Sequence, residues 1–210
     1  TVTATSTPSA TPTPEIPGIY VDPNLPAAFQ NSVQLETAGF VSSAGENAAA
    51  SLAFGAEAPV SYWLYALVAP FPTVTDGIKA TELQAFWQDA SPTVFDQLIL
   101  DNSSYTAIQS IWGEPAGNVE VYAGEDLLSL AWNTPGTWAI IPFEEIQPRW
   151  KVIALDEQSP LHKDFTQEEY PLSVPISLVA AEGALPDGFI ENLQPYIPQT
   201  NREADKLTTV

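Results

Sequence analysis

The stretch that decides the fold is residues 137–179, TWAIIPFEEIQPRWKVIALDEQSPLHKDFTQEEYPLSVPISLV. It contains short elements in quick succession, each closed by a proline or a polar turn. They are a strand over 138–141 ended by Pro142, one or two helical turns over 143–147 ended by Pro148, a strand over 151–155, a polar elbow over 156–160 and an extended run over 170–178. This order predicts a chain that returns from one small lobe to another.

A second break lies earlier, at residues 70–77, PFPTVTDG. It follows a run over 62–69 that is apolar on both faces, as in a buried strand, and it precedes a helical pattern over 80–88. Other strands are predicted over 18–21, 50–55, 95–100 and 119–122, and other helices over 25–36, from 103 or 104 to 112, and over 127–132. Strands alternate with short helices, which predicts an α/β protein with largely parallel sheets.

Helix ends and core positions follow from local chemistry. Asn24 is the predicted cap of the helix over 25–36, and Ser103 or Ser104 caps the helix that Gly113 ends. Helical or strand spacing places these large side chains in the core: Leu83, Phe86, Trp87, Trp63 and Trp132. With 45% apolar residues, the chain has enough apolar surface to bury a core.

The composition excludes several classes of partner. The 210 residues include six Lys and Arg against 26 Asp and Glu, a net charge of −20. Nucleic acid and anionic lipid both require a clustered basic face, which six scattered cations do not form. Without cysteine there is no disulfide and no thiolate metal site, and we predict neither a metal nor a cofactor. We expect an acidic, secreted monomer with no apolar run long enough to span a membrane.

Catalysis has little support in the sequence. His162 is the only histidine, and its neighbours Lys163 and Asp164 indicate a solvated loop, which leaves a structural or rim role, or ligand contact, for His162. Glu144 and Glu145 are adjacent and point apart on a helix, so they would not share a proton. Nucleophile-elbow, Walker and dinucleotide motifs are absent. We therefore predict no catalytic residue.

Residues 1–15 predict a disordered, Thr/Pro-rich tether, because TVTATSTPSATPTP lacks the apolar surface needed for a packed core. The segment resembles tethers that follow the lipid-anchored cysteine of bacterial surface proteins. That resemblance implies an extracellular or cell-surface protein, anchored by lipid through residues upstream of this chain. An ordinary disordered terminus is the alternative.

Three segments carry a family resemblance: LYALVAPFPTVTDGI over 64–78, AIIPFEEIQPRWKVIALDEQSPLHKDF over 139–165, and NREADKLTTV over 201–210. They look like the amino-terminal region of bacterial CapA-type capsule or poly-gamma-glutamate synthesis proteins. The resemblance implies a two-lobed type 2 periplasmic-binding-protein-like fold, with small, mixed, mostly parallel sheets joined by two crossovers. It further implies these boundaries: lobe one over 16–70 and 143–180, lobe two over 74–142, and a linker over 181–210 toward a carboxyl-terminal, metallophosphatase-like CapA domain.

The two crossovers predict a ligand site at the hinge, because ligand sites favour domain interfaces. The candidate ligand-binding residues, each with hinge packing as its alternative role, are Phe71, Thr73, Thr75, Trp138, Asp156, Gln158 and Ser159. Many type 2 anion binders hold the ligand with backbone N–H groups after the first strand. Here Asp22 is negative and Pro23 and Pro26 lack the N–H, which disfavours phosphate or sulfate.

Two functions stay open at this point. The resemblance implies a non-catalytic, extracellular ligand-binding domain of a capsule or poly-gamma-glutamate synthesis protein. Its partner would be a small solute or a polyglutamate or polysaccharide fragment. The alternative is a structural spacer or protein-interaction domain with a degenerate pocket, any enzymatic activity residing in the absent carboxyl-terminal domain. A closed, apolar cleft would favour the spacer.

Overall fold

The structure, a computed structural model, describes residues 17–124, 126–162, 165–181, 185 and 188–202. The predicted tether over 1–15 and the last residues, 203–210, lie outside the described residues. The strands are β1 (Gly18–Val21), β2 (Val41–Ser42), β3 (Ala50–Phe54), β4 (Pro59–Pro70), β5 (Gly77–Ile78), β6 (Gln97–Asp101), β7 (Val119–Tyr122), β8 (Thr137–Pro142), β9 (Trp150–Val152), β10 (Ala154–Leu155) and β11 (Ser173–Ala180). The helices are α1 (Ala27–Ser32), α2 (Ala80–Asp89), α3 (Asn102–Trp112), α4 (Leu127–Asn133) and α5 (Phe189–Leu193), with short 3-10 helices η1 (Gly45–Asn47), η2 (Phe143–Glu145), η3 (Gln167–Glu169) and η4 (Gln194–Tyr196).

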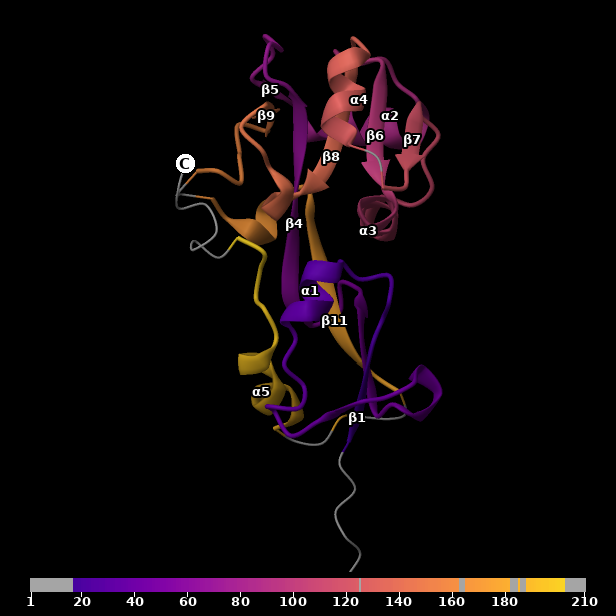
Figure 1. The fold of residues 1–210 in the computed structure, drawn as a ribbon, viewed down its shortest axis with the longest axis vertical. Helices are drawn as coiled ribbons and strands as arrows, with labels where there is room; N and C mark the ends of the chain where they lie inside the picture. Colours follow the sequence, from indigo (N-terminus) through magenta and orange to yellow (C-terminus); the bar gives the residue numbers. More distant parts are fainter. Residues whose placement is uncertain (1–16, 125, 163–164, 182–184, 186–187, 203–210) are drawn as a thin grey trace, which may run out of the picture.

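Nine strands form one sheet that runs through the length of the molecule (Figure 1). Its order is β2-β1-β3-β11-β4-β8-β6-β7, with β9 also paired to β4, while β5 and β10 form a separate pair. Neighbours are parallel within β2-β1-β3, here called lobe one, and within β8-β6-β7, here called lobe two. Antiparallel pairing through β11 and β4 joins the two lobes. The predicted α/β class is confirmed.

The central strand β4 passes from one lobe to the other without a break. Its first half pairs with β11, and its second half pairs with β8 and β9. Residues 64–69 have no exposed surface, because β4 has strand neighbours on its edges and lobe cores on its faces. The predicted crossover at 70–77 therefore follows after the chain has already entered lobe two.

Aromatic packing fills the core of both lobes. The predicted core residues that are buried are Leu83, Phe86, Trp87 and Trp63. Trp87 of α2 donates from Nε1 to the carbonyl oxygen of Gly113 at 2.8 Å. Trp63 of β4 packs edge-on against Phe29 of α1, with ring centroids 5.5 Å apart. The burial of α1 and α2 thus rests in part on large aromatic side chains, Phe29 and Trp87.

Trp132 was predicted in the core, and that prediction was wrong. Its side chain is 41% exposed. Helix α4 buries Leu128 and Ala131 instead, so the next position along the helix turns away from the sheet. The guanidinium of Arg149 lies 4.5 Å from the centroid of the Trp132 ring and covers part of it.

The predicted helix caps also differ from those observed. Asp101, the last residue of β6, caps α3 by accepting the backbone N–H of Ser104 at 2.6 Å, so neither predicted serine, Ser103 or Ser104, is the cap. The strand leads directly into the helix, which leaves the cap position to its final residue. Helix α1 has no side-chain cap, because Asn24 lies in a turn where its own N–H donates to the Asp22 carboxylate at 2.8 Å.

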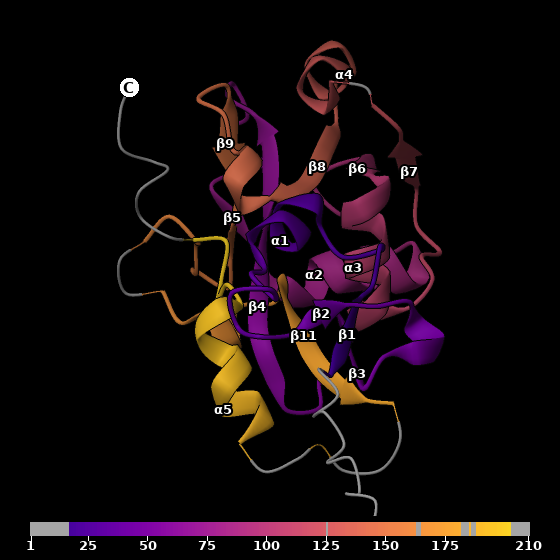
Figure 2. The ribbon, with the colours of Figure 1, turned by 60° about the horizontal axis from the view of Figure 1, so that its bottom comes forward.

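Residues 188–202 pack on lobe one, within the stretch predicted as a linker. Phe189, Leu193 and Ile197 are buried there. Figure 2 shows α5 beside β4, on the side away from β1 and β3. After η4 the chain runs along β4, where the Tyr62 N–H donates to the Gln199 carbonyl oxygen at 3.0 Å. The described part of this stretch is therefore built into the sheet edge of the domain.

Candidate ligand-binding site

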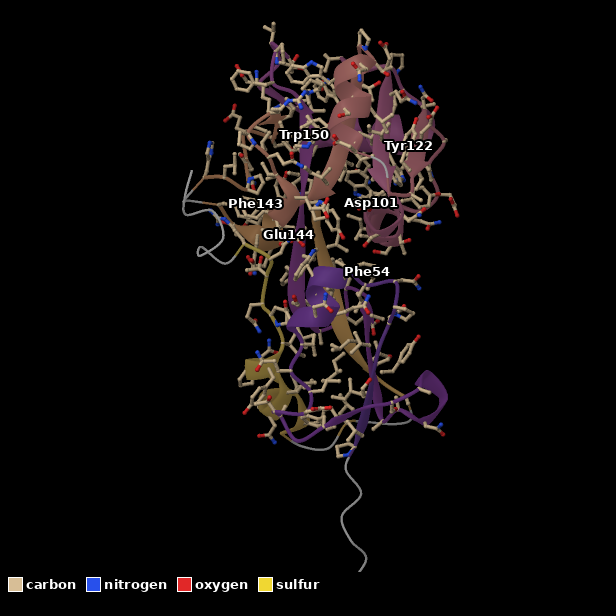
Figure 3. The ribbon with its side chains drawn as sticks, in the orientation of Figure 1. Phe54, Asp101, Tyr122, Phe143, Glu144 and Trp150 are labelled. Atoms are coloured by element: carbon tan, nitrogen blue, oxygen red, sulfur yellow. The ribbon has the colours of Figure 1, made fainter. Side chains whose placement is uncertain are left out.

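Strand ends from both lobes meet at one junction. Strands β1 and β3 run toward it from lobe one, and β6, β7 and β8 run toward it from lobe two, as the pairing of β8 with β4 requires. Figure 3 shows Phe54 on the lobe-one side of this junction and Asp101, Tyr122 and Glu144 on the lobe-two side. In open α/β sheets, ligands bind outside the carboxyl ends of the strands. The junction is therefore the candidate binding region.

The junction is acidic. Tyr65 of β4 is fully buried, and its hydroxyl has no hydrogen-bond partner among the described residues. Burial raises the pKa of Tyr65 well above its usual value, and the charges of Glu144, Asp101 and Glu145 raise it further. The pKa of Glu145 is itself raised, first by loss of surrounding water and then by the neighbouring carboxylates. A field of this sign opposes the binding of an anion.

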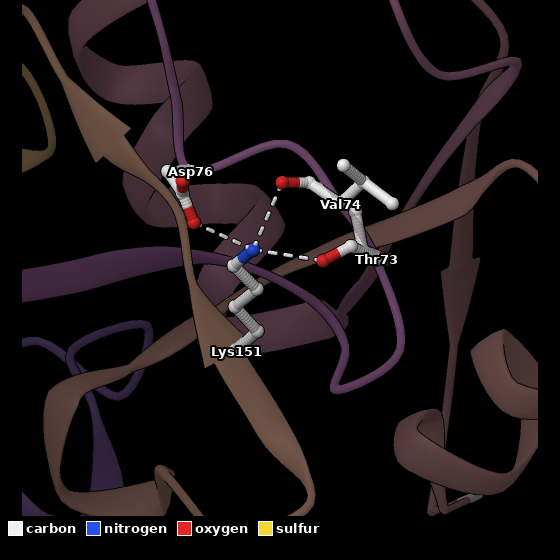
Figure 4. A network of polar contacts seen from close by, with 4 residues as sticks. All are labelled: Thr73, Val74, Asp76 and Lys151. Atoms are coloured by element: carbon white, nitrogen blue, oxygen red, sulfur yellow. Dashed lines mark hydrogen bonds and ion pairs between the residues drawn. The ribbon is translucent and has the colours of Figure 1, made fainter.

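Lys151 of β9, one of the few cations, is held away from the junction (Figure 4). Its Nζ lies 2.7 Å from a carboxylate oxygen of Asp76. It also donates to the carbonyl oxygens of Thr73 and Val74, at 2.8 and 3.2 Å. Lys151 therefore ties the returning strand to the irregular segment that follows β4.

The other Lys and Arg side chains that the structure describes also contact other groups or belong to segments away from the junction. Arg149 covers Trp132, as described above. Arg202 donates to the His162 carbonyl oxygen, and its guanidinium lies 4.9 Å from the centroid of the Phe165 ring. Lys79 precedes α2 in lobe two. The basic side chains that the structure describes therefore make contacts on the surface or between separate segments of the chain.

Three of the residues predicted to form the hinge cleft, Thr73, Trp138 and Asp156, line two separate hollows. Thr73 and Trp138 line a hollow of about 300 Å³ at the end of β4. Trp138 is otherwise buried and stacks on Phe95, with ring centroids 4.8 Å apart. Phe71 is 65% exposed, and Thr75 is half-buried nearby in the chain. The structure thus brings Thr73 and Trp138 together.

The second polar elbow lies at another hollow, of about 430 Å³, which Asp156 lines together with Lys79. The backbones of Gln158 and Leu155 pair with each other through two hydrogen bonds of 2.9 Å. Ser159 is buried, and its hydroxyl accepts the N–H of Leu161 at 3.3 Å. A ligand-binding role for the seven predicted residues stays a prediction.

A third hollow, of about 330 Å³, lies between α1, β4, η2 and the segment after η4. We call it the hinge cavity. Its lining residues with polar side-chain atoms are Ser32, Gln34, Trp63, Glu144, Tyr196, Thr200 and Asn201. Because α1 follows β1 of lobe one and η2 follows β8 of lobe two, a ligand in this cavity would lie between segments that leave the two lobes.

Trp63 combines a place in the wall of the hinge cavity with a buried indole N–H group. The side chain is 2% exposed and lines the cavity. Its Nε1 is buried and has no partner among the described residues. Buried indole N–H groups are normally paired, because an unpaired one loses its hydration without compensation.

Asn201 holds the carboxylate of the cavity in place. Its Oδ1 accepts the Leu64 N–H at 2.8 Å, and its Nδ2 donates to the Leu64 carbonyl oxygen at 2.9 Å. The same Nδ2 donates to Oε2 of Glu144. One side chain therefore connects the carboxyl-terminal segment, β4 and η2, and it presents Glu144 as a fixed acceptor.

Sequence reasoning missed the hinge cavity. Trp63 was predicted in the core, Glu144 was given no site role, and Asn201 fell in the predicted linker. Only one signal pointed to it: a tryptophan in a buried strand needs a partner for its N–H. The other side chains come from segments far apart in the chain, so no spacing in the sequence joins them.

Metal and membrane features are both lacking in the part of the chain that the structure describes. There, no three His, Cys, Asp or Glu side chains gather closely enough to hold a metal ion. His162 is exposed on the surface. None of the described helices has the length and hydropathy to cross a bilayer.

Comparison with known proteins gives matches among solved structures. No protein-family model matches this sequence, and no curated protein does. An ABC-type phosphate transport receptor from Vibrio cholerae is similar with a TM-score of 0.64 at 12% identity, over 86% of this chain and 94% of the receptor. PstS from Borrelia burgdorferi is similar with a TM-score of 0.58 at 11% identity, over 80% of this chain and 87% of PstS.

These similarities establish the fold. The chain has a type 2 periplasmic-binding-protein-like fold, as predicted. At this level of identity the ligands of those proteins do not transfer to this chain.

Proposed function

We propose that this chain is a non-catalytic solute-binding domain that acts outside the cytoplasm. The observation that carries the proposal is the hinge cavity, whose walls combine α1, which follows β1 of lobe one, the shared strand β4, and η2, which follows the carboxyl end of β8 in lobe two. A ligand there would hold the two lobes together. The fold of the binding proteins reported above supports the same class and an extracellular or periplasmic location.

The finer proposal is a role in capsule or poly-gamma-glutamate synthesis, as the amino-terminal domain of a CapA-type protein. It rests on the resemblance of residues 64–78, 139–165 and 201–210 alone. A lipid anchor upstream of residue 1 and a metallophosphatase-like domain after residue 210 belong to this proposal. Its direct test is whether loss of the encoding gene removes capsule or polyglutamate from the cell surface.

A structural spacer is the second candidate function. It is favoured by Trp138, which was predicted to bind ligand but is 4% exposed and stacks on Phe95. In this case the hollows around 70–77 and 156–159 would be packing imperfections, and the domain would hold its neighbours apart. The two functions differ in whether any small molecule stabilises the protein.

A thermal-shift screen separates them. The panel comprises amino acids, glutamyl oligomers, sugars and inorganic phosphate. A ligand at ~100 times its dissociation constant stabilises the folded state by about 2.7 kcal/mol. We expect at least one compound to raise the melting temperature. If none does, at concentrations up to ~10 mM, the solute-binding proposal fails and the spacer remains.

A further inference from the structure

We propose that residues 194–202, here called the strap, brace the hinge between the lobes and hold them in one orientation until Asn201 releases β4. The inference concerns lobe motion, and it does not depend on whether the hinge cavity binds a solute. Three features of the molecule support it: the two crossings between the lobes, the anchoring of the strap on lobe one, and the contacts of the strap with both crossings.

The described chain crosses between the lobes at two places. One crossing is β4, which pairs with β11 up to Leu64 and with β8 from Tyr65 onward. The other is the return from β10 to β11. It ends beside the first crossing, because the Tyr65 N–H donates to the Leu172 carbonyl oxygen at 2.9 Å. A change in the relative orientation of the lobes must therefore bend β4 near Leu64.

The strap is anchored on lobe one. Helix α5, just before it, packs Phe189 against Phe40, with ring centroids 4.9 Å apart. The side-chain amide of Gln194 donates to the carbonyl oxygen of Val60 in β4 at 2.9 Å, and Ile197 is buried. From α5 the yellow chain in Figure 1 runs toward the middle of the molecule. The far end of the strap can therefore restrain what lies beyond lobe one.

That far end holds the first crossing at its bend. The Tyr62 N–H donates to the Gln199 carbonyl oxygen at 3.0 Å, so the strap lies along the edge of β4 that β8 occupies farther on. Asn201 pairs with both the N–H and the carbonyl oxygen of Leu64, at 2.8 and 2.9 Å. Its amide also donates to Glu144 of η2, which follows β8 of lobe two. Bending β4 away from this edge would pull these contacts apart.

The last residue of the strap contacts the second crossing. Arg202 donates to the His162 carbonyl oxygen, and its guanidinium lies 4.9 Å from the centroid of the Phe165 ring. The Phe165 ring packs edge-on against Tyr170, with centroids 5.0 Å apart, and Tyr170 is buried just before β11. One segment that is anchored on lobe one thus touches both crossings and the end of lobe two.

Release of the strap is unfavourable because of where Leu64 lies. Leu64 has no exposed surface, so its N–H and carbonyl groups cannot turn to solvent when Asn201 leaves them. Buried backbone groups without a partner are costly, which keeps molecules with a released strap rare. Without the Asn201 amide a change of orientation no longer breaks these bonds. We expect the share of molecules in other lobe orientations to rise about 10-fold or more.

The test measures lobe orientation by double electron–electron resonance between nitroxide labels on introduced cysteines, since the chain has no cysteine of its own. Ser42→Cys in β2 and Thr81→Cys in α2, both at exposed positions, place one label on each lobe. Thr81→Cys with Ser110→Cys in α3 gives a second pair within lobe two. In the otherwise unchanged protein, we expect one inter-lobe distance, distributed about as narrowly as the distance within lobe two.

Variants of the labelled protein locate the brace. Asn201→Ala removes the contacts with β4 and η2, and Arg202→Ala removes those with the second crossing. Each should broaden the inter-lobe distribution and leave the distribution within lobe two unchanged. The matched control is Gln199→Ala. Among the described residues, the Gln199 amide donates only to carbonyls of the strap itself, so this variant should match the parent.

Broadening in Asn201→Ala or Arg202→Ala that is limited to the inter-lobe pair supports the brace. A broad or two-peaked inter-lobe distribution in the parent would show that the strap does not hold the lobes. Unchanged inter-lobe distributions in every variant that folds would show that the hinge is rigid without the strap, and they would overturn the inference as well. Equal broadening of both pairs would indicate loss of lobe structure and would also count against it.

Discussion

The Asn201→Ala variant tests how the carboxyl-terminal segment is fastened to the central strand. The Leu64 N–H and C=O point away from β11, because the next residue, Tyr65, donates to Leu172 on that side. The Asn201 amide takes the place of a strand neighbour and pairs both groups, at 2.8 and 2.9 Å. It also bonds Glu144. Removing the amide leaves both backbone groups of Leu64 unpaired.

The magnitude follows from the burial of these groups. Leu64 has no exposed surface. An unpaired buried N–H or C=O costs about 1–3 kcal/mol each, and water entering from the hinge cavity recovers part of that cost. We therefore expect Asn201→Ala to lower the free energy of unfolding by about 2–3 kcal/mol. That is a large fraction of the ~5–15 kcal/mol typical of a folded domain.

Urea unfolding followed by far-UV circular dichroism and tryptophan fluorescence measures this loss, with an unchanged m-value as the sign that the folded state is intact. The matched control is Gln199→Ala, two residues earlier. Among the described residues, the Gln199 amide donates only to carbonyls of its own segment, at 3.3 and 3.5 Å, so its removal should cost under ~0.5 kcal/mol. Equal stability of the two variants would refute the role of Asn201.

Three further predictions concern other parts of the molecule. Gly117→Ala should lower the free energy of unfolding in urea by about 1–3 kcal/mol, because an added Cβ would collide with the Phe86 carbonyl oxygen. In the control Gly45→Ala, the added Cβ meets nothing closer than 3.6 Å and should not clash, so equal losses in the two variants would contradict this prediction. Glu145→Gln should raise the melting temperature at pH 7, because the pKa of Glu145 is raised in the folded state and its ionised form therefore opposes folding. The gain in stability is present above the folded-state pKa of Glu145 and disappears as the pH falls below the ordinary value of 4.5. It should be modest because the side chain is exposed. A gain in stability that grows in acid would show that the predicted direction is wrong. Thr73→Trp should fill the hollow that Thr73 shares with Trp138 and block binding if the ligand lies there, but leave calorimetric binding unchanged if the ligand lies in the hinge cavity.

The order of elements could be predicted from the sequence because it depends on local periodicity. β1 and β7 have the predicted bounds, and α2 and α4 extend one residue beyond theirs. The strand predicted over 151–155 is instead two short strands, β9 and β10. Between them the Ile153 N–H donates to the Leu67 carbonyl oxygen of β4, so neighbouring residues pair with different sheets. The residues of a strand do not by themselves determine which strand it pairs with.

By itself, the sequence determined the α/β class, the alternation of strands and short helices, and the excess of acidic residues that disfavours an anionic ligand. Each of these depends on composition or on neighbours a few positions apart. Only the tertiary structure decided where a ligand could bind. The contact of Leu64 with Asn201 joins residues 137 positions apart, and it brings Glu144 beside the cavity that Trp63 lines. That meeting depends on one edge of β4 being shared between β8 and the carboxyl-terminal segment, and edge pairing of this kind is settled by the packing of the whole sheet.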